Sequence, residues 1–354
     1  MHFATALRRG PHGRLLLALR DSHIACATLG VDTRAARAAL FAGPAGLTGL
    51  AAALLDGVWR ESPAAGPLAV ASLLALVLAA ACAVVSAGRG RRRRTTPGHP
   101  DEGLCAAGLE APPGTVTGLI GPAGAGKTMF LDAVTGLRRP PGGPVRLGGA
   151  DLGSAAPHVR ARLGMARTFQ RPEPFGSLSV RGNVLVAAEI HAMTRETPGR
   201  AGRRGWRRRR QARREAGPVA DRLLERVGIA GYAACPAARV PPWAARLLDL
   251  ARALATEPRL LLLDEPFSGL PVPAARSLEC LLRDLAAEGV AVLLVEHDLE
   301  TVMGVCDVLC VLDRGELVSH GPPVQVRADP RVHEAYLGRP AAGDGRPGAP
   351  VAVA

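Results

Sequence analysis

The chain has 354 residues, which is room for two domains, and a formal net charge of +13 that comes almost wholly from arginine. This charge suits a partner with acidic groups, either nucleic acid or an anionic membrane face, and does not decide between them. The seven cysteines form neither a CxxC pair nor a Cys/His cluster, which argues against a zinc site and against a disulfide-stapled secreted domain. The sequence therefore predicts reduced cysteines in a protein that faces the cytosol.

Two apolar stretches stand in the first third of the chain. No cleavable signal peptide is expected, because the apolar run 15–19 is too short and charges follow it at once. Residues 68–87 carry no charge over about 20 positions, enough for a helix to cross a hydrocarbon core, and an arginine cluster at 89–94 follows as a cytoplasmic flank. Residues 35–55 are a weaker span, interrupted by Gly43 and Pro44. We expect one or two transmembrane α-helices, with a buried core helix as the alternative interpretation of 68–87.

Part of this region resembles a known membrane protein family. The runs 13–21, 27–32 and 43–55 are similar to a late slice of the permeases of bacterial branched-chain amino-acid ABC transporters. In that family the slice is a cytoplasmic loop that docks on the ATPase, followed by membrane helices. The resemblance implies a permease-like cytoplasmic loop at 1–34 and a membrane segment at 35–88. Most spans of a solute pathway are absent, and chance similarity among Ala/Leu-rich segments is the alternative.

An Arg/Pro-rich linker is expected at 89–102, before the clearest motif of the chain. Residues 121–128, GPAGAGKT, match the phosphate-loop pattern at every fixed position, between a strand-like and a helix-like run. Lys127, the only lysine of the chain, is expected on the outer phosphates of ATP, and Thr128 on Mg²⁺. Backbone N–H groups are expected to wrap the phosphates where the loop has its glycines, Gly121, Gly124 and Gly126.

Two later apolar runs end in residues that fit phosphate chemistry. Residues 260–263 are four leucines followed by Asp264 and Glu265, a buried parallel strand whose carboxyl end faces the nucleotide. Asp264 is expected to hold Mg²⁺, and Glu265 to orient the attacking water as a general base. The run 290–295 delivers His297 to the same edge of the sheet, where it can stabilise the transferring phosphate.

In this order and spacing, the motifs resemble ABC-type ATPases, most closely the ATP-binding subunits of branched-chain amino-acid transporters. The resemblance covers 103–338 and implies an α/β P-loop NTPase domain of ABC type with an inserted helical subdomain. It implies ATP and Mg²⁺ as cofactors, with Gln170, at the end of the run 164–170, as a further catalytic and Mg²⁺-binding residue. It also implies permease subunits and an extracytoplasmic solute-binding protein as partners, at the plasma or inner membrane with the ATPase domain in the cytoplasm. Residues 339–354 are expected to be a disordered tail.

One motif departs from this family. ABC domains sandwich ATP head to tail, and a signature segment of the second domain closes each site. Here the signature falls on residues 240–246, where Trp243 replaces the close-approach glycine and Pro241 and Pro242 offer no N–H group. We expect a non-functional signature, and therefore a heterodimer with an ordinary ABC subunit and at most one working site. An adenine-stacking aromatic is also missing upstream of the loop, so ATP binding is expected to be weak.

Three functions are compatible with these observations. The favoured one is the ATP-binding, energy-coupling component of an ABC importer, with branched-chain amino acids as the implied solute. The alternative is a membrane-tethered pseudo-ATPase, acting as a regulatory or structural subunit or remaining as a decaying fusion. A third is a soluble ABC ATPase that acts on nucleic acid through the arginine-rich run around Trp206. The apolar span disfavours that role, so no nucleic-acid partner is expected.

Overall fold

The structure is a computed structural model that describes residues 10–38, 108–138, 144–194 and 203–337. The chain divides into two compact units. Within the described residues, the helical unit contains residues 10–38, 154–194, 203–258 and 269–277, and the sheet unit contains residues 108–138, 144–153, 259–268 and 278–337.

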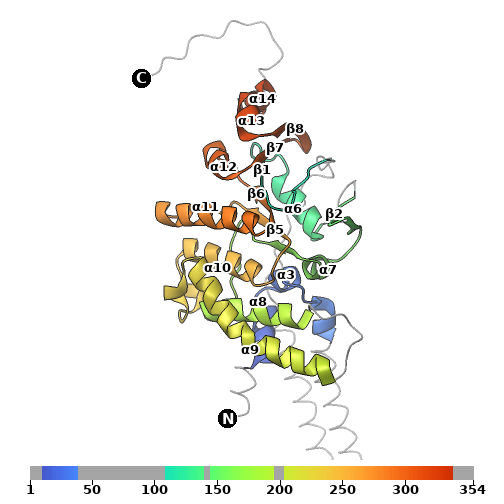
Figure 1. Cartoon of the computed structure of the whole chain (residues 1–354), viewed down its shortest axis with the longest axis vertical. Helices are drawn as coiled ribbons and strands as arrows, with labels where there is room; N and C mark the ends of the chain where they lie inside the picture. The colour runs from blue at the N-terminus through green and yellow to red at the C-terminus, as the bar shows by residue number, and fades with distance from the viewer. Residues whose placement is uncertain (1–9, 39–107, 139–143, 195–202, 338–354) are drawn as a thin grey trace, which may run out of the picture. The chain divides into compact units, whose positions relative to one another are not determined.

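The strands of the sheet unit lie in the order β5 (Leu260–Asp264), β6 (Ala291–Val295), β1 (Val116–Ile120), β7 (Val308–Asp313) and β8 (Glu316–Gly321) (Figure 1). The first four are parallel, and β8 is antiparallel to β7. The four parallel strands are mostly buried, and their almost continuous apolar sequences are those of strands covered on both faces. Asp264 pairs with Val295 and Leu119 also pairs with Val295, so β1, β5 and β6 end at one edge of the sheet.

Helices and a small hairpin complete the sheet unit. Its α6 (Lys127–Thr135) begins directly after the phosphate loop and buries Phe130, Leu131 and Ala133. Further along the chain come α12 (Leu299–Val305), α13 (Pro323–Ala328) and α14 (Pro330–Leu337), and β2 (Arg146–Leu147) pairs antiparallel with β3 (Ala150–Asp151). The longer α11 (Val272–Ala287) belongs to the sheet unit from Leu278 onward, and there it buries leucines at helical spacing, which are Leu278, Leu281, Leu282 and Leu285.

The helical unit packs its core around α8 (Val180–Thr194) and α10 (Pro242–Leu254) (Figure 1). These helices contact each other and α9 (Arg203–Arg226), which contains the arginine-rich run around Trp206. Near the N-terminus, α2 (Pro11–Asp21) packs against α8, and α3 (His23–Thr28) packs against α7 (Pro157–Arg162). The unit also contains β4 (Met165–Arg167) and the short turns η2 (Ala230–Tyr232) and η3 (Ala237–Arg239).

The predicted membrane segment falls mostly on residues that the structure does not describe. Within the described ranges, none of the helices combines the length and the apolar character that a membrane crossing requires. The predicted span 68–87 and the linker 89–102 lie outside these ranges, as does the tail 339–354. The predicted span 35–55 lies outside them from residue 39 onward. Both spans stay predictions.

Candidate nucleotide site

The phosphate loop connects β1 to α6, and its backbone conformation requires glycine at several positions. Gly124 and Gly126 have φ of +85° and +98°, the left-handed region that glycine enters without a steric penalty. At Gly121 a Cβ atom would lie 2.0 Å from the carbonyl oxygen of Leu312 on β7, so that only glycine fits. The loop is also held to the β7–β8 turn, because the Gly315 N–H donates to the Ala125 carbonyl at 3.1 Å.

Lys127 is folded back over the loop. Its ammonium group donates to the carbonyl oxygens of Gly121 at 2.7 Å and of Pro122 at 2.9 Å. Partial burial lowers the pKa of Lys127, and the nearby carboxylates of Glu265 and Asp264 oppose this shift. The three charged groups therefore belong to one electrostatic cluster within the sheet unit.

The two carboxylates follow each other at the end of β5 but have different surroundings. Asp264 is 1% exposed, whereas Glu265 is half-buried. Glu265 has a φ of +48°, a conformation that costs a non-glycine residue on the order of 1–3 kcal/mol and that clusters at functional sites. Its N–H donates to the carbonyl of Val295 at 2.9 Å. This hydrogen bond fixes the backbone that aims the Glu265 side chain.

The donor atoms at the start of α6 and the end of β5 fit a magnesium ion. Mg²⁺ takes hard oxygen ligands, usually one or two from the protein and the rest from phosphates and water. The Thr128 hydroxyl and the buried Asp264 carboxylate are ligands of that kind, and both flank Lys127 in the sheet unit. A buried carboxylate also gains from a cation that shares its environment.

His297 leaves the end of β6 with an exposed ring, beside a carboxylate that no motif of the sequence singles out. The side chain of His297 is 64% exposed, and its Nδ1 lies 3.6 Å from Glu296 Oε2. Glu296 is buried, accepts the Phe267 N–H at 3.1 Å, and has its pKa raised by burial. It thereby ties the segment after Glu265 to the segment that carries His297. The only sequence signal for it is an acidic residue placed where an apolar strand ends.

Gln170 belongs to the helical unit, where it follows β4. Its side chain is exposed, and its backbone carbonyl accepts a hydrogen bond from Arg246 Nη1 at 3.2 Å. The other predicted site residues lie in the sheet unit, namely Gly121, Gly124, Gly126, Lys127, Thr128, Asp264, Glu265 and His297. The role of Gln170 at the nucleotide stays a prediction.

The segment predicted to be a degenerate signature lies at the start of α10 in the helical unit. Pro242 is the first residue of the helix and Pro241 its N-cap, positions where a missing N–H costs little. The half-buried Trp243 makes an edge-on contact with Tyr232, with ring centroids 5.9 Å apart and planes at 81°. The indole is thus held in place by the protein itself. Whether this segment can close a partner's nucleotide site stays a prediction.

Known proteins are similar to this chain over stretches much longer than these motifs. The family model for ABC transporters matches residues 105–268, and the model described as "Branched-chain amino acid ATP-binding cassette transporter" matches residues 316–342. The high-affinity branched-chain amino acid transport ATP-binding protein BraF of Pseudomonas aeruginosa is 38% identical over 224 residues, covering 63% of this chain and 87% of that protein. The corresponding LivG protein of Escherichia coli (strain K12) is 36% identical over 231 residues, covering 65% and 89%. A solved nucleotide-free ATP-binding cassette from an ABC transporter matches with a TM-score of 0.52 and 25% identity, covering 65% of this chain and 91% of its own.

Proposed function

This chain belongs to the ABC transporter family, among the ATP-binding proteins of the branched-chain amino acid type, and from that premise we propose that it couples ATP hydrolysis to the import of branched-chain amino acids. The prediction of an ABC-type ATPase is confirmed by the same relatives. The proposal for this chain's own chemistry rests on one observation above all, the cluster of Lys127, Asp264 and Glu265 at the phosphate loop. The solute class is taken from what the relatives are named for.

We assign the following roles at the site. Backbone N–H groups of the loop and the Lys127 ammonium bind the phosphates of ATP, and Lys127 gives up its two carbonyl partners to do so. Thr128 and Asp264 would hold Mg²⁺, which when bound offsets the negative charge that grows on the phosphates. Glu265 accepts the proton of the attacking water, and its fixed backbone sets the direction of attack.

His297 and Gln170 complete the proposed set. The exposed ring of His297 can turn toward the transferring phosphate. The neighbouring Glu296 fixes the end of β6 by accepting a hydrogen bond from the Phe267 N–H. Gln170 would contribute to Mg²⁺ and to the attacking water, as the family resemblance implies.

Partners and location follow from the proposed role. Permease subunits and an extracytoplasmic solute-binding protein would be needed to move a solute, at the plasma or inner membrane with the ATPase domain on the cytoplasmic side. Residues 1–34 would be a permease-like loop, 35–88 the membrane segment and 89–102 the linker to the ATPase domain 103–338 and its tail 339–354. The uncharged stretch 68–87 and the arginines after it support this arrangement.

The second candidate is a pseudo-ATPase that binds nucleotide without useful turnover. Pro241, Pro242 and Trp243 favour it, because the two prolines offer no N–H group to a phosphate across a dimer and the indole stands where the family has its close-approach glycine. The intact loop and carboxylates of the sheet unit favour hydrolysis instead.

ATP hydrolysis by the purified full chain, alone and mixed with an ABC subunit of normal signature, separates the two candidates. We expect phosphate release in the mixture, and a fall of at least about 100-fold in Glu265→Gln, as is typical when a general base is removed. ATP binding should survive this substitution. The matched control is Glu300→Gln, an exposed glutamate of α12, which should turn over normally. Binding without turnover in every mixture would establish the pseudo-ATPase.

A further inference from the structure

The helices α13 and α14 belong to the sheet unit and follow the edge strand β8 in the chain. Both pack against β8, and α13 also packs against β7 and α12 (Figure 1). All residues to which we assign a role in ATP binding or hydrolysis precede these two helices in the chain. The two helices nevertheless lie against the strands that hold the phosphate loop.

The first turn of α14 is anchored on β8. The Asp329 carboxylate accepts the Arg331 N–H at 3.0 Å, and the Ser319 hydroxyl of β8 donates to the same carboxylate. Val332 adds an apolar contact, since it is 3% exposed. Tyr336 stands four residues after Val332 and therefore on the same face of the helix. The anchored first turn thus determines where Tyr336 is placed.

From this face, Tyr336 reaches the phosphate loop. Its hydroxyl oxygen accepts a hydrogen bond from the N–H of Gly121, the first residue of the loop. Burial raises the pKa of Tyr336, the Gly121 N–H acts against this shift, and the Asp298 carboxylate adds to it. The phenol is therefore neutral at physiological pH, where its oxygen serves as a hydrogen-bond acceptor.

Gly121 is the residue where several contacts on the loop meet. Its carbonyl accepts the Lys127 ammonium at 2.7 Å, and an added Cβ would lie 2.0 Å from the Leu312 carbonyl oxygen. The pairing of β1 with β7 ends at Ile120, one residue before the Gly121 N–H. Tyr336 therefore holds the peptide group at the point where the sheet register stops fixing the backbone.

Tyr336 also neighbours the segment that carries His297. Its electrostatic partner Asp298 is the N-cap of α12, where the carboxylate accepts the N–H groups of Glu300 at 3.3 Å and Thr301 at 3.2 Å. His297 directly precedes this cap in the chain. One side chain of α14 is thus close to both the start of the phosphate loop and the start of α12.

We propose that Tyr336 is a positioning residue of the nucleotide site, which fixes the Gly121 peptide group and thereby the phosphate loop and the resting position of Lys127. The proposal rests on the proposed binding of ATP by this loop. Tyr336 acts through Gly121 and contacts no reacting atom. A loop that is already fixed presents its N–H groups to the phosphates without a further cost of ordering, so the Tyr336 hydroxyl contributes to ATP affinity.

Tyr336→Phe in the full chain removes the hydroxyl and keeps the ring. We expect ATP affinity, measured by equilibrium titration, to fall about three- to tenfold, as is typical for one lost hydrogen bond. Hydrogen exchange at the Gly121 amide should become faster by about the same factor in the nucleotide-free chain. In a mixture that hydrolyses ATP, KM should rise while kcat changes less than about twofold, because the loop holds the phosphates equally before and in the transition state.

Two control variants should leave ATP affinity and Gly121 exchange unchanged. Tyr232→Phe removes the same hydroxyl from the other tyrosine of the chain, and Glu334→Gln alters an exposed residue of α14. Unchanged ATP affinity and Gly121 exchange in Tyr336→Phe would overturn the proposal, and a lower urea midpoint beside them would mean that Tyr336 only packs α14. An unaltered chain that binds no ATP would contradict the proposed function instead. Gly121 exchange in the nucleotide-free chain would then still decide whether Tyr336 holds the loop.

Discussion

Gly121 and Glu265 owe their backbone conformations to neighbouring strands rather than to their own preferences. Gly121 passes so close to β7 that a methyl group would overlap the Leu312 carbonyl. Glu265 is held at a positive φ by its hydrogen bond to Val295 on β6. Both residues therefore depend on a complete sheet, and the sheet in turn fixes where the loop N–H groups and the carboxylate point.

Gly121→Ala adds one methyl group and tests whether the phosphate loop depends on the close approach of Gly121 to β7. The Cβ atom would meet a backbone oxygen that cannot rotate away, so the loop or β7 must shift, at a cost of about 1–3 kcal/mol or more. We expect ATP affinity, measured by equilibrium titration, to fall at least about tenfold, since roughly 1.4 kcal/mol corresponds to a factor of ten. Gly231→Ala is the control, because nothing lies within 4 Å of the added atom. Unchanged affinity in Gly121→Ala would contradict the close approach.

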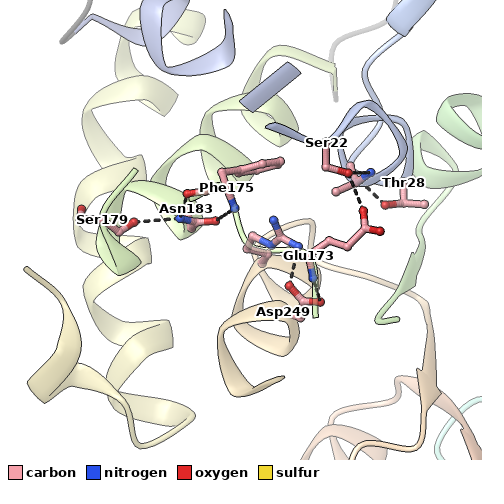
Figure 2. Close-up of polar contacts among 9 residues, drawn as sticks. Ser22, Thr28, Glu173, Phe175, Ser179, Asn183 and Asp249 are labelled. Atoms are coloured by element: carbon pink, nitrogen blue, oxygen red, sulfur yellow. Dashed lines mark hydrogen bonds and ion pairs between the residues drawn. The ribbon is translucent and has the colours of Figure 1, made fainter. Parts of the chain in front are cut away.

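Among the elements, α10 of the helical unit contains a buried pair of opposite charges. It is buried on almost every side, and it nevertheless contains Asp249 and Arg252, which are 3% and 4% exposed. Burial raises the pKa of Asp249, while Arg252 and the Glu173 N–H, which donates to Asp249 at 3.2 Å, act in the opposite direction (Figure 2). The pair thus holds the loop of residues 173–177 at the expense of desolvating two charged groups.

Asp249→Ala should be costly for that reason. The substitution leaves the Arg252 guanidinium buried without its carboxylate, which typically costs about 3–5 kcal/mol. We expect a clearly lower urea midpoint for the chain. Asp221→Ala is the matched control: it removes the carboxylate that pairs with Arg181, where both side chains are at least 40% exposed, and surface pairs contribute about 1 kcal/mol or less. Similar midpoints for the two variants would mean that the buried pair adds no more than a surface one.

For the whole molecule, the sequence predicts an asymmetry between an intact phosphate loop and a degenerate signature in one chain. Two composite sites form when such a chain pairs with an ordinary ABC subunit. One site combines the Lys127 loop with the partner's signature, and the other combines the partner's loop with Trp243 and its prolines. We predict that only the first site works, because Pro241 and Pro242 offer no N–H group to the phosphate.

In the reconstituted heterodimer, we expect ATP turnover to depend on the general base of this chain and not on that of the partner. Glu265→Gln should remove ATP turnover, while the equivalent glutamine substitution in the partner should have little effect, because the partner's loop faces the defective signature. Phosphate release at saturating ATP measures both. Turnover that survives Glu265→Gln would mean that the other composite site works and that Trp243 does not block it.

The sequence by itself determined the phosphate loop, the carboxylates after β5 and the placement of His297, because each is carried by a short local pattern. Parallel strands bring their carboxyl ends to one edge, so that rule alone predicts that these separate patterns meet in one site. The sequence also predicts spans at 35–55 and 68–87, which lie wholly or mostly outside the described residues.

Only the tertiary structure decided the contacts that join distant parts of the chain. Arg14 and Glu189 are 175 positions apart, Ser22 and Glu173 are 151 apart, and Phe267 and Glu296 are 29 apart. No local periodicity encodes such pairs, since an arginine on an amphipathic helix or a glutamate after a strand has many possible partners. Their choice depends on which helix faces pack and which strands pair, and the chain settles that only when it buries its apolar surface as a whole.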